Sequence, residues 1–181
     1  MSSPVKSLLM ARRLDYSARF VSHTVPQVWA ALQNTDHWET RLDELRVFSP
    51  NELTSLEVEK SKIDATFNHI IPRELMPELA RAVLRKDMVI TRREHFDYDG
   101  KSITGHSSAS IPGGPGSLSA RTLVAADGRG AVLRVTFEAQ VNIPIVGGQL
   151  ERVMLTHLLE LLDKEWGATG NWLDANSRAV V

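Results

Sequence analysis

The chain contains no cysteine among its 181 residues. Disulfides, thiolate nucleophiles and metal centres with cysteine ligands are therefore excluded. The sequence also lacks any apolar run that approaches the ~20 residues a helix needs to span a bilayer. The short run Leu8–Ala11 is followed by two arginines and is too short for the core of a secretory signal. We therefore expect a cytoplasmic protein.

Positive and negative charges are nearly balanced, since the chain has 21 Lys and Arg and 22 Asp and Glu, for a net charge of −1. This balance gives no electrostatic footprint for nucleic acid. The six histidines form no close-spaced set with a carboxylate that would predict a metal site, and no motif predicts a cofactor, a nucleophilic serine or a phosphate loop. The length and the hydrophobic content of 43% predict one globular domain over residues 13–175, preceded by a flexible tail over residues 1–12.

Period-two alternation of apolar and polar residues predicts a sheet of consecutive hairpins. A strand over residues 14–20 is followed by two short predicted helices, from Val25 and from Asp36 through Arg41. A further amphipathic helix is predicted near residues 73–85, where it interrupts the strands. The remaining predicted strands lie within residues 45–71, with Thr54, Leu56 and Val58 sharing a face, and over 88–98, 101–111, 117–125 and 131–143.

Gly147 and Gly148 precede a long apolar helix that we predict to reach about Trp172. Its apolar residues cover roughly half of the helix circumference, against the ~100° stripe of an ordinary surface helix. The width indicates either a thick core under a curved sheet or a wall of a ligand cavity. Glu151 and Glu165 fall within the apolar arc, and we expect both to reach solvent near the helix ends.

The strand over residues 88–98 places Arg92 and Glu94 on the same face as Met88, Ile90 and Phe96. Burying charges is costly unless they pair with one another or face a wet cavity. One interpretation is that a bulge turns the two charged residues outward. The other is that they form a polar anchor in an otherwise apolar pocket.

His69 shares the inward face of its strand with Phe67. A lone histidine on an apolar face is either a hydrogen-bonded core residue or an orienting or acid–base group. We take Arg92, Glu94 and His69 as the polar candidates for a ligand site. The candidate apolar wall consists of Tyr16, Phe67, Phe137, Met154, Leu158 and Leu162.

Three segments, at residues 20–29, 111–115 and 143–151, resemble the START-like superfamily, which includes birch-pollen-allergen-like proteins, polyketide cyclases and lipid-transfer domains (SRPBCC). The local details are similar to an uncharacterised bacterial branch. The resemblance implies an α+β helix-grip fold, in which a curved antiparallel sheet of six to seven strands wraps around a long C-terminal helix. It also implies an internal cavity for an apolar molecule and carries no catalytic motif.

Three functions are compatible with this pattern. The first is binding or transport of a hydrophobic small molecule or lipid without catalysis. The second is a cyclase-like or aromatase-like enzyme that uses His69 with Arg92 or Glu94 as acid–base groups. The third is a protein-interaction module whose apolar helix faces a partner.

Overall fold

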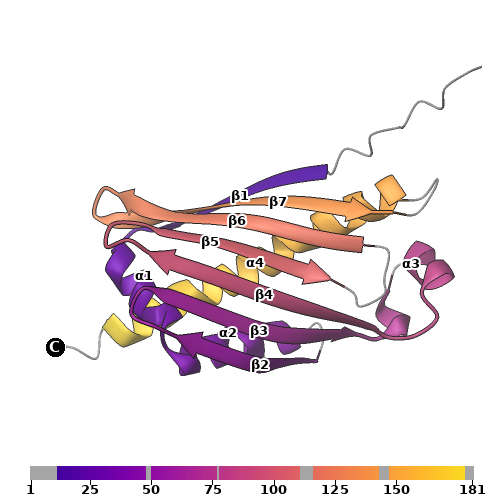
Figure 1. Cartoon of the computed structure of the whole chain (residues 1–181), viewed down its shortest axis with the longest axis horizontal. Helices are drawn as coiled ribbons and strands as arrows, with labels where there is room; N and C mark the ends of the chain where they lie inside the picture. The colour runs from indigo at the N-terminus through magenta and orange to yellow at the C-terminus, as the bar shows by residue number, and fades with distance from the viewer. Residues whose placement is uncertain (1–11, 48–49, 77, 111–115, 143–146, 178–181) are drawn as a thin grey trace, which may run out of the picture.

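The computed structural model describes residues 12–47, 50–76, 78–110, 116–142 and 147–177. Seven antiparallel strands form one sheet with the order β1-β7-β6-β5-β4-β3-β2 (Figure 1). The α+β helix-grip prediction is thereby confirmed. The strands are β1 (Arg12–Phe20), β2 (Asn51–Val58), β3 (Lys62–Ile71), β4 (Met88–Tyr98), β5 (Ile103–Ser110), β6 (Gly116–Asp127) and β7 (Gly130–Val141).

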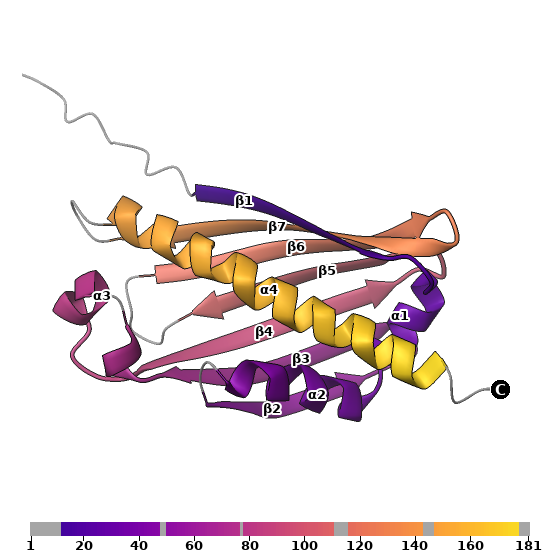
Figure 2. The ribbon, with the colours of Figure 1, turned by 180° about the vertical axis from the view of Figure 1, so that it is seen from behind.

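One long helix crosses a single face of this sheet diagonally, and we call that face the inner face (Figure 2). Two shorter helices follow β1, and a small helical segment lies between β3 and β4 at the end of the sheet where β4 begins. The helices are α1 (Val25–Leu32), α2 (Thr35–Arg46), the 3-10 turn η1 (Arg73–Leu75), α3 (Glu78–Val83) and α4 (Gly147–Ser177). The predicted tail lies almost entirely outside the described residues, which begin at Arg12.

The second helix is longer than predicted, because α2 continues past Arg41 to Arg46. It begins where the side chain of Asn34 accepts a hydrogen bond from the backbone N–H of Asp36 at 2.9 Å, which satisfies one of the free donors at a helix start. Leu45, predicted to begin a strand region, is buried on the same helix. Burial of apolar side chains against the sheet and α4 thus stabilises the last turn of α2, where local sequence signals predicted that the helix had already ended.

Strand β2 carries a bulge between Leu53 and Ser55, which the alternation of the sequence did not predict. The bulge leaves Thr54 without a partner residue in β3, and its hydroxyl donates to the backbone oxygen of Thr66 at 2.9 Å. Thr54 is therefore exposed and does not share the inward face of Leu56. The dipeptides Asp99-Gly100 and Asp127-Gly128, which are typical of hairpin turns, join β4 to β5 and β6 to β7 with positive φ at Gly100 and Gly128.

The core lies between the inner face and the helices. Side chains of all seven strands contribute to it, and the helical part comes from α1, α2 and, in the described part of α4, residues from Leu158 to Leu173. Trp38 of α2 and Phe67 and Phe96 of the sheet form one aromatic group, with ring centroids of Trp38 6.3 and 6.4 Å from the other two. The sheet is thus most firmly packed at the end that α1 and α2 cover.

Candidate functional site

Burial of the inner face changes along the strands. Toward the α1 end, Phe96 of β4, Ile103 of β5 and Val124 of β6 are buried. Toward the α3 end the same face is partly accessible. The partly accessible inner-face residues there, which we call the open patch, are Met88, Ile90 and Arg92 of β4, Ser107 and Ala109 of β5, and Leu118 of β6. The strand pairing makes the patch contiguous, since Arg92 faces Ala109 and Ala109 faces Leu118.

Four charged side chains meet beside the open patch, and we call them the charge cluster. Arg92 and Glu94 come from β4, Arg41 from α2 and Glu165 from α4. Arg92 Nη2 donates to Glu94 Oε1 at 2.5 Å and to Glu165 Oε2 at 3.1 Å, while Arg92 Nη1 also pairs with Glu165. Arg41 Nη2 donates to Glu165 Oε2 at 3.3 Å. The cluster therefore ties one strand and two helices together.

The charge cluster is almost entirely withdrawn from water. The Arg41, Glu94 and Glu165 side chains are 2–4% exposed, and the Arg92 side chain is 12% exposed. The guanidinium of Arg41 lies over the rings of Trp38 and Trp166, at 4.9 and 4.6 Å from their centroids. Of the two interpretations, the inward one holds, because Arg92 and Glu94 lie on the inner face and the pairing of β4 with β3 and β5 has no bulge at either residue.

Glu165 was predicted to reach solvent, and this prediction is wrong, because the residue is 1% exposed. Its position on α4 lies within the buried stripe of Leu158, Leu162 and Trp166, so only a pairing with cations makes its burial tolerable. Burial raises the pKa of Glu165, but attraction to Arg92 and Arg41 outweighs it and lowers the pKa to about 2. Glu165 is therefore ionised at neutral pH.

Glu151 is also buried, contrary to the prediction that it reaches solvent. Its Oε1 accepts a hydrogen bond from the backbone N–H of Val141 at 2.9 Å, and its Oε2 lies 3.4 Å from Arg12 Nε. Glu151 thus joins the first turns of α4 to the end of β7 and the start of β1. The burial of Glu151 is tolerated for the same reason as that of Glu165, because hydrogen-bond donors satisfy the buried carboxylate.

His69 lies next to the charge cluster on β3, where its neighbour Phe67 pairs with Arg92 of β4. The Arg92 guanidinium lies 4.6 Å from the centre of the Phe67 ring. Burial, assisted by repulsion from Arg92, lowers the pKa of His69 to about 4 despite the opposing attraction of Glu165. The imidazole is neutral at pH 7, and its buried Nε2 has no hydrogen-bond partner in the described part of the chain.

A second buried histidine, His37 of α2, was not identified from the sequence. Its Nε2 lies 2.9 Å from the hydroxyl of Thr169 on α4. Burial and the nearby Arg41 lower the pKa of His37 to about 3. The signal in the sequence was its position in the same helix face as Arg41 and Leu45, which was missed because the helix was predicted to end early.

The residues of the candidate apolar wall do not all lie together in the structure. Phe67, Phe137, Leu158 and Leu162 are buried in the core. Tyr16 lies on β1, four strands from β4, and its hydroxyl donates to Asp163 Oδ1 at 2.9 Å. Burial and this carboxylate raise the pKa of Tyr16. The side chain of Met154 lies outside the described residues, although its backbone belongs to α4.

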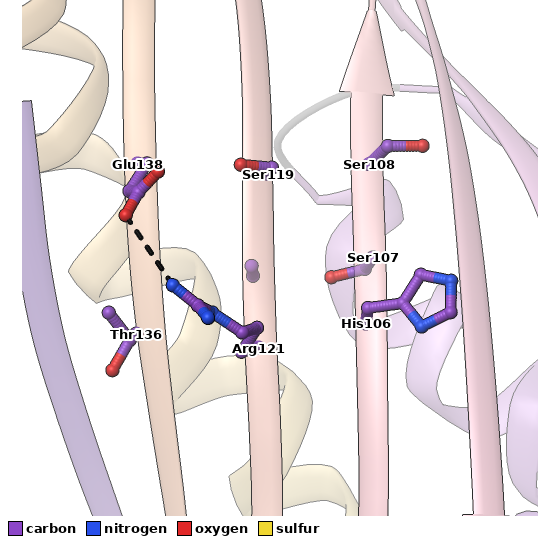
Figure 3. A pocket seen from close by; sticks show the side chains of 8 residues that line it. His106, Ser107, Ser108, Ser119, Arg121, Thr136 and Glu138 are labelled. Carbon is purple, nitrogen blue, oxygen red and sulfur yellow. Dashed lines mark ion pairs between the residues drawn. The ribbon is translucent and has the colours of Figure 1, made fainter. Parts of the chain in front are cut away.

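A separate shallow depression lies on the outer face of the sheet. Figure 3 shows it over β5, β6 and β7 with α4 behind the strands, and it has a volume of about 230 Å³. Its outward side chains include His106, Arg121 and Glu138, and Arg121 lies 3.8 Å from Glu138. The depression therefore lies on the opposite side of the sheet from the charge cluster.

Two kinds of site are absent from the described residues. No helix in those ranges is long and apolar enough to cross a membrane. Within the same part of the chain, no group of three or more histidine and acidic residues is arranged to hold a metal ion.

Sequence comparison identifies the family. Residues 15–173 match the model of the family described as "Protein of unknown function (DUF2505)", and the chain belongs to this family. The uncharacterised protein Rv0481c of Mycobacterium tuberculosis is 27% identical over 178 residues, which cover 92% of this chain and 99% of that protein.

The fold is shared with solved structures of low sequence identity. TTHA0849 from Thermus thermophilus matches with a TM-score of 0.60 at 14% identity, covering 92% of this chain and 99% of that chain. Human STARD10 matches with a TM-score of 0.55 at 7% identity, covering 96% of this chain and 69% of that chain. These similarities confirm the helix-grip fold of the START-like superfamily that the sequence resembled.

Proposed function

We propose that this protein binds a hydrophobic small molecule or lipid between the inner face of the sheet and α4. The observation that carries the proposal is the open patch, a contiguous group of partly accessible side chains beside the buried residues of the same face. Most of its side chains are apolar or small, and Arg92 contributes the polar edge. A concave apolar surface with a few convergent polar groups is the usual composition of a ligand site. The helix-grip fold is consistent with this use.

The proposed roles follow from position. Phe67, Phe137, Leu158 and Leu162 supply apolar surface, and Arg92, Glu94 and His69 supply the polar end. Tyr16 is assigned to the far rim, because it pairs with an exposed aspartate four strands from β4. Each additional methylene buried would contribute about 0.8 kcal/mol, so affinity for unbranched ligands should rise roughly fourfold per carbon until the open patch is covered.

The test combines native mass spectrometry of the purified protein with titration of the uncharged dye Nile red. We expect a co-purified apolar molecule or saturable dye binding. Ala109→Trp fills the open patch and should weaken dye binding at least tenfold. Its matched control is Ser108→Trp, whose exposed side chain points to the outer face one residue away. Equal dye affinity of both variants, or no dye binding by the unmodified protein, would contradict the proposal.

A second candidate is a cyclase-like enzyme in which His69 acts with Arg92 or Glu94. It is favoured by one observation, namely that these three side chains lie on the same face of two adjacent strands. Arg92 and Glu94 are already paired with each other, which leaves the neutral His69 as the group free to move a proton. Loss of water from an added poly-carbonyl chain, abolished by His69→Gln, would support catalysis. Recovery of the chain unchanged would support binding alone.

The interaction-module hypothesis has less support. Exposed large apolar side chains in the described chain are distributed over several elements rather than gathered along α4: Val21, Val47, Val58, Ile70, Val89, Leu123 and Leu159. Scattered exposed apolar residues are normal on a protein surface.

A further inference from the structure

The charges around the proposed site restrict the chemical class of its ligand. The charge cluster contains two arginines and two glutamates, and these four side chains sum to zero net charge. Both carboxylates are bound directly to the arginines, so neither guanidinium is left as an unmatched cation. His69 adds no charge, since its lowered pKa keeps the imidazole neutral at pH 7.

An anionic ligand head group would be unfavourable in this position. A carboxylate placed beside Arg92 would approach Glu94 and Glu165, which already accept three hydrogen bonds from that arginine. Burying such a charge without a free counter-ion is costly. A ligand ammonium would meet the two arginines, each of which is also cationic.

An uncharged polar head group on the ligand would be favourable in this position. The Nε2 atom of His69 is buried and has no hydrogen-bond partner among the described residues. A buried nitrogen of this kind carries a desolvation cost that a new partner would remove. A neutral imidazole can donate from one nitrogen and accept at the other, so a hydroxyl or a carbonyl could satisfy it.

We infer that the ligand is an uncharged amphiphile, with an apolar body on the open patch and a hydroxyl or carbonyl group directed at His69 and Arg92. This inference rests on the proposed function and adds the charge class of the ligand. Fatty acids and other anionic amphiphiles are disfavoured by the neutral, internally paired cluster.

The test is displacement of Nile red by dodecanol and by dodecanoate, at about pH 8, where the carboxylate is ionised. The two ligands share one alkyl chain and differ in the head group. On the unmodified protein we expect dodecanol to bind at least tenfold more tightly than dodecanoate. Equal affinity, or a preference for dodecanoate, would overturn the inference while leaving the proposed function in place. Absence of Nile red binding would overturn both.

Two variants test the cause of the preference. Glu94→Gln gives the cluster a net charge of +1 and should raise the affinity for dodecanoate at least tenfold with little change for dodecanol. Glu57→Gln, on the exposed face of β2, makes the same change in total charge away from the site and should leave the ratio unaltered. An unchanged ratio in Glu94→Gln would refute the electrostatic argument. The comparison on the unmodified protein decides the matter if this variant does not fold.

His69→Phe keeps an aromatic ring and removes both nitrogens. We expect it to weaken dodecanol at least tenfold while Nile red still binds, whereas His106→Phe on the outer face should have no effect. Dodecanol affinity that survives in His69→Phe would exclude His69 as the polar partner.

Discussion

Replacing Arg92 by methionine would test how the charge cluster is held together. The substitution keeps an unbranched side chain of similar length but removes the guanidinium that pairs with both Glu94 and Glu165. Arg41 remains as the sole cation of the cluster, and its Nη1 atom is 3.9 Å from Glu94. Two buried carboxylates would then share one arginine.

The size of the effect follows from the pKa of Glu165, which the two arginines hold at about 2 against an ordinary value of 4.5. A difference of two to three pKa units corresponds to about 3 kcal/mol of unfolding free energy, since each unit is worth about 1.36 kcal/mol. Removing one partner of a buried ion pair typically costs about 3–5 kcal/mol. We therefore expect Arg92→Met to lose about 3–5 kcal/mol and to lower Tm by about 6–20 °C.

Urea unfolding followed by tryptophan fluorescence would measure this loss. The adjacent Arg93→Met is the matched control, because Arg93 is exposed on the outer face, and it should change stability by less than about 0.5 kcal/mol. A second arm removes one carboxylate as well, and Arg92→Met with Glu165→Gln should recover part of the loss. A decrease below about 1 kcal/mol for Arg92→Met would refute the assignment of a buried, paired cluster.

The loss of stability in Arg92→Met should depend on pH. Because the folded pKa of Glu165 lies below its unfolded value, its contribution is present above about pH 4.5 and is lost as the pH falls toward about 2. The stability difference between the unmodified protein and Arg92→Met should therefore narrow below about pH 4.5. A difference that is independent of pH in this range would mean that Glu165 is not the group that responds to Arg92.

Two further predictions concern buried histidines and a close backbone contact. The folded pKa values of about 3 for His37 and about 4 for His69 lie below the ordinary 6.5, so the stability that the neutral imidazoles contribute is present above pH 6.5 and is lost on acidification. Replacing both histidines by phenylalanine should therefore flatten the dependence of the unfolding free energy on pH between about pH 6.5 and 4. An unchanged slope would contradict the burial of the two histidines. A Cβ at Gly105 would lie 2.5 Å from the Phe96 ring, whereas one at Gly167 meets nothing within 4 Å. In thermal unfolding, Gly105→Ala should cost about 1–3 kcal/mol and Gly167→Ala should add about 0.5–1 kcal/mol, with equal effects refuting the contact.

The order of elements could be predicted from the sequence because it depends on local periodicity. The alternation around Met88, Ile90 and Phe96 placed Arg92 and Glu94 on the same face as these residues, but it left open whether a bulge turns the two charged residues outward. The turns at Gly100 and Gly128 followed from the conformational freedom of glycine. Each of these predictions required only residues close in sequence.

The partners of the charge cluster could not be predicted in the same way. Glu165 was assigned to solvent because a carboxylate in an apolar arc normally lies outside, and its burial depends on arginines about 70 and 120 residues away. Arg41 was missed although it lies within the predicted helix, because its partners Glu94 and Glu165 are distant in sequence. Burying a charged side chain alone is costly, and it becomes tolerable only when an oppositely charged partner, here distant in sequence, is buried with it. A single sequence does not reveal that pairing.

The strand order also has a consequence for how the chain acquires its structure during synthesis. Strand β1 is made first, but among the described strands its sheet neighbour is β7, and Phe20 pairs with Ala131 about 110 residues later. At about 5–20 residues per second, β1 waits about 5–20 s for its partner to be translated. The hairpins from β2 to β6 have no such delay, so β1 is the strand exposed longest to wrong pairing with other nascent chains. Its alternating Arg13, Asp15 and Arg19 side chains place charge along that exposed edge, which opposes aggregation.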